Sequence, residues 1–270
     1  MIEQRVGFVG AGQMAQALAR GFVQAGLIEP SRVIAYDPVP TALDNLTRAV
    51  QGVRRAGGNR QVVEESDVVF LAVKPQHMNP ALADLRPAVA SSKLFVSIAA
   101  GITIARLCDS LGMGRVIRVM PNTPCLVGRG AAGFALGPAA SQDDGKLTAE
   151  LLSSIGLALP VDESLLDAVT GLSGSGPAFV YVLIEAMADA GVRVGLPRAT
   201  AALLAAHTFR GAAEMVIATG DHPAVLKDRV ASPGGTTIAG LEALESQAGR
   251  AAMMAAVVAA TRRSQELGNQ

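Results

Sequence analysis

The sequence predicts an α/β fold in two parts: a doubly wound domain built on a parallel sheet over residues 1–162, and an all-helical domain over residues 163–270. Three observations lead to this prediction. In the first half, short runs rich in β-branched residues alternate with helical stretches, which is typical of a parallel sheet covered on both faces. These runs stop after Asp162. Beyond that point the chain contains long helical stretches that are apolar around most of their circumference.

Five strands are predicted in the first domain, and each ends in a turn-forming or small-residue segment: Arg5–Val9, Arg32–Tyr36, Asp67–Val73, Leu94–Ile98 and Arg115–Met120. A glycine-rich turn and a helix from Met14 to Ala25 follow the first strand. Ligands of doubly wound sheets bind at the carboxyl ends of the strands. The segments after these strands are therefore the candidate binding loops.

Four helices are predicted in the second domain: Phe179–Ala190, Ala199–Ala218, Gly240–Ser246 and Gly249–Leu267. A helix that is apolar all round must be buried, either in a large core or against another subunit. A domain of this length supplies only a thin core for such helices. We therefore expect the helical domain to form a homo-oligomer interface.

Charge and composition exclude several classes of protein. The chain has 23 basic and 23 acidic residues and no run of Lys or Arg, which argues against a nucleic-acid partner. Its two cysteines, Cys108 and Cys125, are too few for a disulfide framework and favour reduced thiols in a cytoplasmic protein. The three histidines show no spacing typical of metal ligands, so no metal site is expected.

The apolar segments do not indicate membrane insertion. The most apolar ones, Leu94–Ala105 and Ala251–Ala260, are shorter than the roughly 18 residues that a membrane span needs. Polar residues open the chain, and glycines interrupt the apolar run that follows, so no signal peptide is indicated.

The stretch Gly10-Ala11-Gly12-Gln13-Met14-Ala15 fits the G-x-G-x-x-G/A pattern directly after a strand and at the start of a helix. Gly10 permits a tight turn, Gly12 lets a pyrophosphate approach the backbone, and Ala15 allows close packing of helix and strand. The helix N-terminus offers free N–H groups to the phosphates. The pattern predicts a Rossmann-type dinucleotide site; the alternative is a glycine-rich turn that only packs.

Asp37 ends the second strand, 25 residues after Gly12, where an acidic side chain accepts a hydrogen bond from a ribose 2′-OH and repels a 2′-phosphate. That position favours NAD(H). Four arginines (Arg32, Arg54, Arg55 and Arg60) are nearby in the sequence, and Asn59 has an amide that could bind a phosphate. The choice between NAD(H) and NADP(H) therefore stays open, and Asp37 could instead be a simple turn residue before Pro38.

Three further strand ends should line the cleft for the nicotinamide half of the cofactor: Ala72-Val73-Lys74-Pro75, Ser97-Ile98-Ala99-Ala100-Gly101 and Met120-Pro121-Asn122-Thr123-Pro124. Small residues there let a ring lie close to the backbone, and Asn122 and Thr123 offer neutral hydrogen bonds. Lys74 is either part of this site or a solvated charge on a loop.

Two segments of the second half are dense in Gly and Ser, Thr170–Phe179 (TGLSGSGPAF) and Ala231–Thr237 (ASPGGTT), and each leads into a predicted helix. A helix start with free N–H groups and hydroxyls suits a carboxylate. Ordinary N-capping would explain one Ser or Thr but not two adjacent glycines. We interpret both segments as ligand-binding loops.

Taken in order, the motifs GFVGAGQMA, LAVKPQ, SIAAG, RVMPNTP, AVTGLSGSGPAF, LPRA and LKDRVASPGGTTIAGL resemble those of pyrroline-5-carboxylate reductases over nearly the whole chain. The resemblance implies hydride transfer from NAD(P)H to the C=N bond of 1-pyrroline-5-carboxylate to give L-proline, the last step of proline biosynthesis. It also implies a helical domain that forms an intertwined dimer, either alone or in a ring of dimers.

The resemblance further implies a role for individual residues. Thr237 matches the catalytic hydroxyl that contacts the substrate nitrogen, the backbone of Ser232–Thr236 would hold the carboxylate, and Glu163 matches a position near the substrate. The residues implied for the pyrophosphate, the adenosine and the nicotinamide respectively are Gly10, Ala11, Gly12, Gln13 and Met14; Asn59; and Ala72, Val73, Lys74, Pro75, Ala99, Ala100 and Asn122. Many relatives have Ser or Thr near position 37, so Asp37 departs from the family pattern and keeps NADH open.

Two other functions fit part of the sequence. A β-hydroxyacid dehydrogenase also combines a glycine fingerprint with a helical domain, but it needs a catalytic Lys on a helix of the second domain. The one lysine there, Lys227, precedes the SPGG segment. A non-catalytic nucleotide-sensing protein could keep the fold without turnover, although the retention of Thr237 argues against it.

Overall fold

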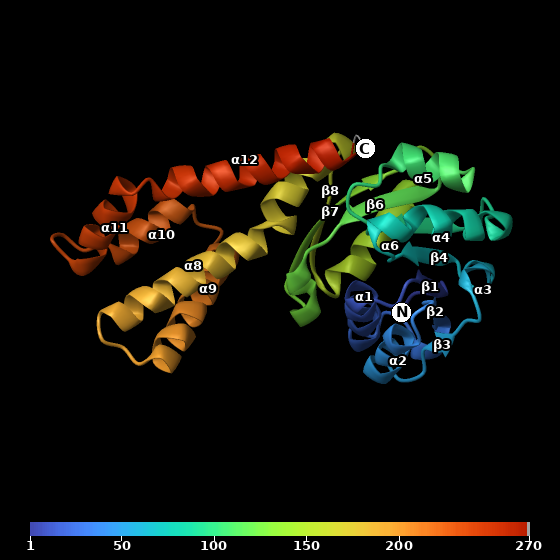
Figure 1. Ribbon diagram of the computed structural model, residues 1–270, viewed down its shortest axis with the longest axis horizontal. Coiled ribbons are helices and arrows are strands. Elements are labelled where there is room, and N and C mark those ends of the chain that lie inside the picture. The colour runs from blue at the N-terminus through green and yellow to red at the C-terminus, as the bar shows by residue number, and fades with distance from the viewer. Residues whose placement is uncertain (269–270) are drawn as a thin grey trace. The chain divides into compact units, whose positions relative to one another are not determined.

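The computed structural model describes residues 1–268 (Figure 1). Its internal contacts group the chain into two compact units, Met1–Ser175 together with the chain from Ala259, and Gly176–Val258. The boundary expected between residues 162 and 163 stays a prediction. Within residues 1–268, no helix is long and apolar enough to cross a membrane.

The first unit contains one sheet of eight strands: β1 Val6–Val9, β2 Val33–Tyr36, β3 Arg54–Arg55, β4 Val68–Leu71, β5 Leu94–Ser97, β6 Val116–Met120, β7 Gly130–Leu136 and β8 Gly156–Pro160. Their order is β3-β2-β1-β4-β5-β6-β7-β8. The first six are parallel, so all five predicted strands form and the doubly wound α/β fold is confirmed. The strand order reverses between β1 and β4, and this reversal opens a crevice for ligands at their carboxyl ends.

The helices of this unit cover the two faces of the sheet and bury a separate apolar core on each. They are α1 Gln13–Gln24, α2 Pro40–Ala49, α3 Asn59–Glu64, α4 Met78–Leu85, α5 Ile104–Leu111, α6 Gln142–Ser153 and the short α7 Leu166–Val169. On one face the rings of Phe8, Phe22 and Phe70 pack together with centroids 5.2–6.2 Å apart; Phe8 stacks on the other two, which are tilted against each other. On the other face Met78, Leu82 and Leu85 of α4 are buried among strand residues. Burial of such side chains stabilises the sheet by roughly 1.5–3 kcal/mol each.

Strand β7 was not predicted, and it runs antiparallel to β6. Only residues 121–129 join the two strands, and a parallel connection needs a crossover of a dozen or more residues. Its sequence, GAAGFAL, consists mostly of residues with low β-propensity, so it lacks the β-branched signal that identified the other strands. Strand β8 then pairs parallel to β7 and forms the edge of the sheet.

The second unit is entirely helical, as predicted. It contains α8 Gly176–Arg193, α9 Arg198–Thr219, α10 Pro223–Val230, α11 Thr236–Ser246 and most of α12 Gly249–Gly268. Helix α10 was not predicted. Only small residues are buried here, Ala188, Ala201 and Ala205. Large apolar side chains remain exposed, for example Val182 at 63% and Leu203 at 65%. The single chain therefore gives these helices no core of their own.

A charged pair ties the start of α6 to the sheet. The Asp144 carboxylate accepts from Arg115 Nη2 at 2.7 Å and from Arg115 Nε at 3.1 Å, and also from the Ser141 N–H in a capping box. Hydrogen bonds from Arg115 lower the pKa of Asp144 in the folded protein. The carboxylate therefore contributes stability above its unfolded-state pKa of about 3.9. That contribution is lost as the pH falls through the lower folded-state pKa.

We expect Asp144→Asn to lower the free energy of unfolding at pH 7 by roughly 1.5–3 kcal/mol, the usual contribution of hydrogen bonds to a charged group. Because the variant cannot ionise at this position, the gap between it and the wild type should shrink on acidification below about pH 4. Urea titrations at fixed protein concentration at pH 7 and pH 3 measure both effects. Asp143→Asn, whose side chain is 88% exposed, is the control and should change little. An equal gap at both pH values would contradict the assignment.

Candidate active site

The glycine-rich segment forms a tight turn where β1, β2 and β4 end. Gly10 has φ +98°, and a Cβ placed on it would lie 2.8 Å from the Ala72 carbonyl oxygen, so only glycine fits between the ends of β1 and β4. The Gly10 N–H donates to the Tyr36 carbonyl at the end of β2 at 2.8 Å. The expected residues Gly10 and Ala72 are thus brought into contact.

Gly12 leaves space where a phosphate would lie. No atom lies within 4 Å of a Cβ built on it, and it begins α1 without a side-chain cap. The first N–H groups of α1, which starts at Gln13 and Met14, are therefore left for a ligand. Ala15 is completely buried, as close packing of helix and strand requires.

Asp37 braces this loop. Its Oδ2 accepts from the Ala11 N–H at 2.8 Å, and its Oδ1 accepts from the Val39 N–H at 2.9 Å. The carboxylate therefore ties the end of β2 to the glycine-rich turn. A ribose contact by Asp37 stays a prediction, but the side chain lies next to the loop where the pyrophosphate would bind.

Two asparagines expected at the cofactor make bonds within the protein. Asn59 begins α3, and its Nδ2 donates to Asp84 Oδ2 at 3.1 Å. Asn122 is buried, with Nδ2 donating to the Ser173 carbonyl at 3.0 Å and Oδ1 accepting from the Ala131 N–H at 2.9 Å. Asn122 thus joins the end of β6 to two other segments, and its cofactor role stays a prediction.

The loops after β4 and β5 border a cavity of about 610 Å³ in the first unit. The expected residues Pro75 and Ala100 line it together with Gln76, Gly101, Arg106 and Arg263. Ala72 and Val73 are half-buried, Ala99 is buried, and Lys74 is exposed beside Pro75. Sequence reasoning did not assign Gln76, Arg106 or Arg263 to the site; of these, only Gln76 belongs to a motif that it had singled out, LAVKPQ.

The first Gly/Ser segment is not a loop, which corrects the prediction. Residues Thr170–Gly174 form a turn of π-helix between α7 and α8. The Thr170 hydroxyl donates to the Leu166 carbonyl at 2.8 Å, and the Ser173 hydroxyl donates to the Val169 carbonyl at 3.1 Å. Both hydroxyls therefore bond to carbonyls four residues back, and the segment continues as helix.

The second Gly/Ser segment is a tight turn that precedes α11. Gly234 has φ +65°, a conformation that favours glycine, and a Cβ on Gly235 would lie 2.2 Å from Ser232 Oγ, so a side chain there would displace the Ser232 hydroxyl. The Gly235 N–H donates to the Ser232 carbonyl at 3.1 Å. Helix α11 then starts at Thr236 with no side-chain cap, and Thr237 is half-buried in its first turn. Free N–H groups at this helix start suit a carboxylate.

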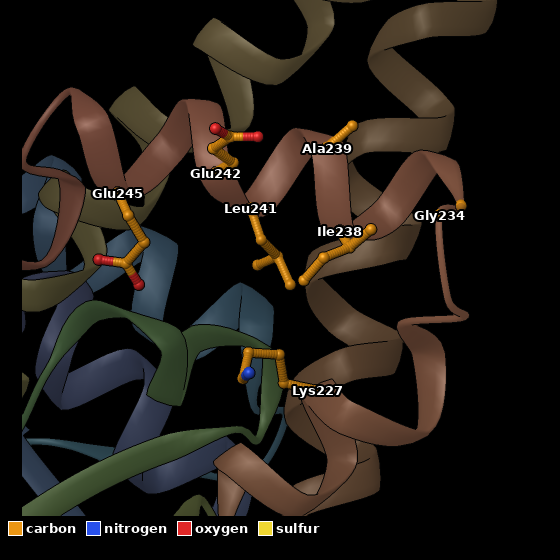
Figure 2. Close-up of a pocket in the computed structure, with 8 residues that line it drawn as sticks. Lys227, Gly234, Ile238, Ala239, Leu241, Glu242 and Glu245 are labelled. Atoms are coloured by element: carbon orange, nitrogen blue, oxygen red, sulfur yellow. The ribbon is translucent and has the colours of Figure 1, made fainter.

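Gly234 and Gly235 also border a cavity of about 520 Å³ between α10 and α11. Figure 2 shows Ile238 and Leu241 extending from α11 toward Lys227 of α10. The acids Glu242 and Glu245 line the same cavity. The residues expected to bind substrate at positions 232–237 thus all belong to the second unit, whereas the expected cofactor residues belong to the first.

Glu163 lies in the first unit, just before α7. Its Oε1 accepts from the Ile104 N–H at the start of α5 at 2.7 Å and from Arg118 Nη1 at 3.1 Å. The Arg118 side chain is only 8% exposed, so Glu163 compensates a nearly buried charge of β6. A contact with substrate stays a prediction. The sequence hinted at this pair, because an arginine inside the apolar run RVIRVM needs an acidic partner.

Comparison with known proteins agrees with this architecture. Residues 163–267 match the family model for pyrroline-5-carboxylate reductase dimerisation, and residues 5–101 match that for NADP oxidoreductase, coenzyme F420-dependent. The chain is 49% identical to a pyrroline-5-carboxylate reductase of Arabidopsis thaliana over 97% of this chain and 95% of that one. It is 47% identical to one of Methanosarcina acetivorans over the full length of both.

A solved structure of a relative is also similar. The pyrroline carboxylate reductase of Plasmodium falciparum, crystallised with NADP bound, superposes with a TM-score of 0.87 at 34% identity and 99% coverage of both chains.

We expect Asn122→Ala to lower the free energy of unfolding by roughly 1–3 kcal/mol, because it leaves the Ala131 N–H and the Ser173 carbonyl without their partner. Denaturant titration at fixed protein concentration measures the loss. Asn79→Ala is the matched control, since Asn79 is exposed and its oxygen accepts only from Arg106 in an exposed pair. Equal losses in the two variants would mean that the hydrogen bonds of Asn122 contribute no more to the free energy of unfolding than an exposed pair does.

Proposed function

The chain belongs to the pyrroline-5-carboxylate reductase family, and we propose on that premise how its residues share the reaction. Its function is the NAD(P)H-dependent reduction of the C=N bond of 1-pyrroline-5-carboxylate to L-proline, the last step of proline biosynthesis. The observation that carries this conclusion is 49% identity over nearly the full length of both this chain and a relative.

The cofactor supplies the hydride, and the glycine turn supports its place in the first unit. Gly10, Ala11, Gly12, Gln13 and Met14 hold the pyrophosphate, because the start of α1 has open space and N–H groups without side-chain caps. Asn59 and Asp37 would hold the adenosine. The residues that would border the nicotinamide lie at the ends of β4, β5 and β6: Ala72, Val73, Lys74, Pro75, Ala99, Ala100 and Asn122.

The substrate carboxylate binds at the start of α11. The backbone of Ser232–Thr236 would hold it, because α11 starts at Thr236 without a side-chain cap, and the positive end of the helix favours its charge. Glu163 approaches the substrate through Oε2, while its Oε1 remains bonded to Ile104 and Arg118.

Thr237 is the catalytic residue. A protonated cyclic imine is already a good electrophile, so the protein mainly has to orient it against the hydride donor. The Thr237 hydroxyl contacts the imine nitrogen. It stabilises this nitrogen as the atom loses its positive charge during hydride transfer.

The protein is a homo-oligomer, at least a dimer, and acts in the cytoplasm. Support for the dimer comes from the second unit, where Tyr181, Val182, Leu203 and Ile217 are each more than 60% exposed in the single chain. Burying such side chains against a second copy would provide the core that the chain lacks.

The two other functions have less support. A β-hydroxyacid dehydrogenase is disfavoured because full-length relatives carry the reductase name. A nucleotide-sensing protein would bind cofactor without turnover. Steady oxidation of NAD(P)H on addition of pyrroline-5-carboxylate supports the enzyme, whereas binding with no oxidation supports the sensor.

We expect Thr237→Ala to lower kcat roughly ten- to a hundredfold, on the scale of a lost transition-state hydrogen bond. Thr237→Ser keeps the hydroxyl and should recover much of the activity. Ser153→Ala, which removes an exposed hydroxyl of α6, is the control. Initial rates at saturating cofactor measure these effects; unchanged kinetics in Thr237→Ala would remove Thr237 from the mechanism.

We expect sedimentation equilibrium at micromolar concentration to give a mass at least twice the 27.6 kDa of one chain. The physical reason is the apolar surface of α8 and α9, which water would otherwise contact. A mass of one chain at this concentration would overturn the proposed dimer.

A further inference from the structure

We propose that this protein selects NADH over NADPH, and that Asp37 is the residue that excludes the 2′-phosphate. The inference rests on the proposed function only in requiring a dinucleotide at the glycine turn. It concerns binding, so it can fail or hold independently of turnover.

The first argument is the position of the Asp37 carboxylate. It follows β2, the neighbour of β1 on the side away from β4, which is where the adenosine ribose lies in doubly wound domains. Its Oδ2 accepts from the Ala11 N–H at 2.8 Å, inside the turn that would hold the pyrophosphate. Its Oδ1 accepts from the Val39 N–H at 2.9 Å. Two backbone donors thus fix the carboxylate beside the turn that would hold the pyrophosphate. The side chain cannot move away from a 2′-phosphate without breaking both hydrogen bonds.

The second argument is that the nearby arginines already have partners. Arg54 pairs with Glu65, Arg55 pairs with Asp44 at 2.7 Å, and Arg60 pairs with Asp84 at 3.5 Å. Each arginine is therefore matched by one acid, and the three pairs add no net positive charge. Asp37 makes no ion pair with any of residues 1–268. No cation of these residues therefore neutralises the Asp37 carboxylate at the end of β2 through an ion pair.

Two other side chains predicted near the cofactor, Arg32 and Asn59, are also poorly placed to bind a 2′-phosphate. Arg32 precedes β2, so it lies at the amino end of the strand, opposite to the binding edge. The Asn59 amide already donates to a carboxylate, Asp84. The ribose 2′-OH of NADH, by contrast, can donate to Asp37, because each carboxylate oxygen can accept more than one hydrogen bond.

The expected preference is about tenfold or more in dissociation constant. Like charges about 4 Å apart repel measurably even at the dielectric constant of water, and more strongly near a protein surface. Salt screens this repulsion, so the gap between NADPH and NADH should narrow as ionic strength rises. A purely steric exclusion would not depend on salt in this way.

The test is direct binding to the full-length protein without substrate. Fluorescence titrations give dissociation constants for NADH and NADPH at low and high salt, and competition with 5′-AMP and adenosine 2′,5′-bisphosphate isolates the contribution of the 2′-phosphate. We expect wild-type protein to bind NADH and 5′-AMP about tenfold or more tightly than their 2′-phosphorylated counterparts at low salt.

Two variants assign the effect to Asp37. Asp37→Ser and Asp37→Asn both remove the charge and should close most of the gap, mainly through tighter binding of the 2′-phosphorylated ligands. Asp143→Asn changes net charge equally, but it lies on α6, which packs against β8 at the other end of the sheet. Its gap should match that of the wild type.

The proposal is overturned if wild-type protein binds NADPH as tightly as NADH. It is also overturned if the Asp37 variants weaken both cofactors equally, since that would make Asp37 a brace of the glycine turn and nothing more. Should one variant fail to fold, the wild-type salt dependence and the other variant still decide. An NADH preference without turnover of pyrroline-5-carboxylate would support this proposal and overturn the proposed function.

Discussion

The candidate cofactor site depends on the contact between the backbone of Gly10 and that of Ala72. A side chain at Gly10 would overlap the carbonyl that ends β4, so the turn exists only because that position has none. The same turn is bonded to the end of β2 through Tyr36 and Asp37. The ends of β2 and β4 thus each lie against the turn that follows β1, and α1 starts there with its N–H groups free of side-chain caps. Every residue proposed for the pyrophosphate takes its position from this convergence.

The second unit presents a different constraint. Its helices bury only small residues against one another, while large apolar side chains of α8 and α9 remain exposed. Hydrophobic burial is the main favourable contribution to folding, so these helices cannot be at their most stable as a single chain. The turn Ser232–Gly235 and Thr237 belong to this unit. The proposed substrate residues therefore belong to the unit whose large apolar side chains a single chain leaves exposed.

Several residues placed at the site by motif also have structural roles that were not predicted from the sequence. Asn122 bridges Ala131 and Ser173, Glu163 compensates Arg118, and Asp37 braces Ala11. Ala131 is 9 residues from Asn122, and the other partners are between 26 and 51 residues away in the chain. Periodicity and local motifs carry information about residues a few positions apart in the chain. They therefore cannot predict contacts between residues that are tens of positions apart. The π-helical turn at Thr170–Gly174 was missed for a related reason: Gly and Ser favour loops locally, but here the hydroxyls bond to helix carbonyls.

The sequence by itself determined the two-part α/β and helical fold, the five β-branched strands, the glycine turn and the reductase family. It could do so because hydrophobic periodicity, glycine spacing and family motifs are all local in the chain. Only the tertiary structure decided the antiparallel course of β7, whose Gly- and Ala-rich sequence has little strand propensity and whose pairing follows from a short connection. It also decided which charges are paired: Arg54, Arg55 and Arg60 pair with Glu65, Asp44 and Asp84, whereas Asp37 accepts from two backbone N–H groups. Side-chain pairing depends on distances in space, which the order of residues does not specify.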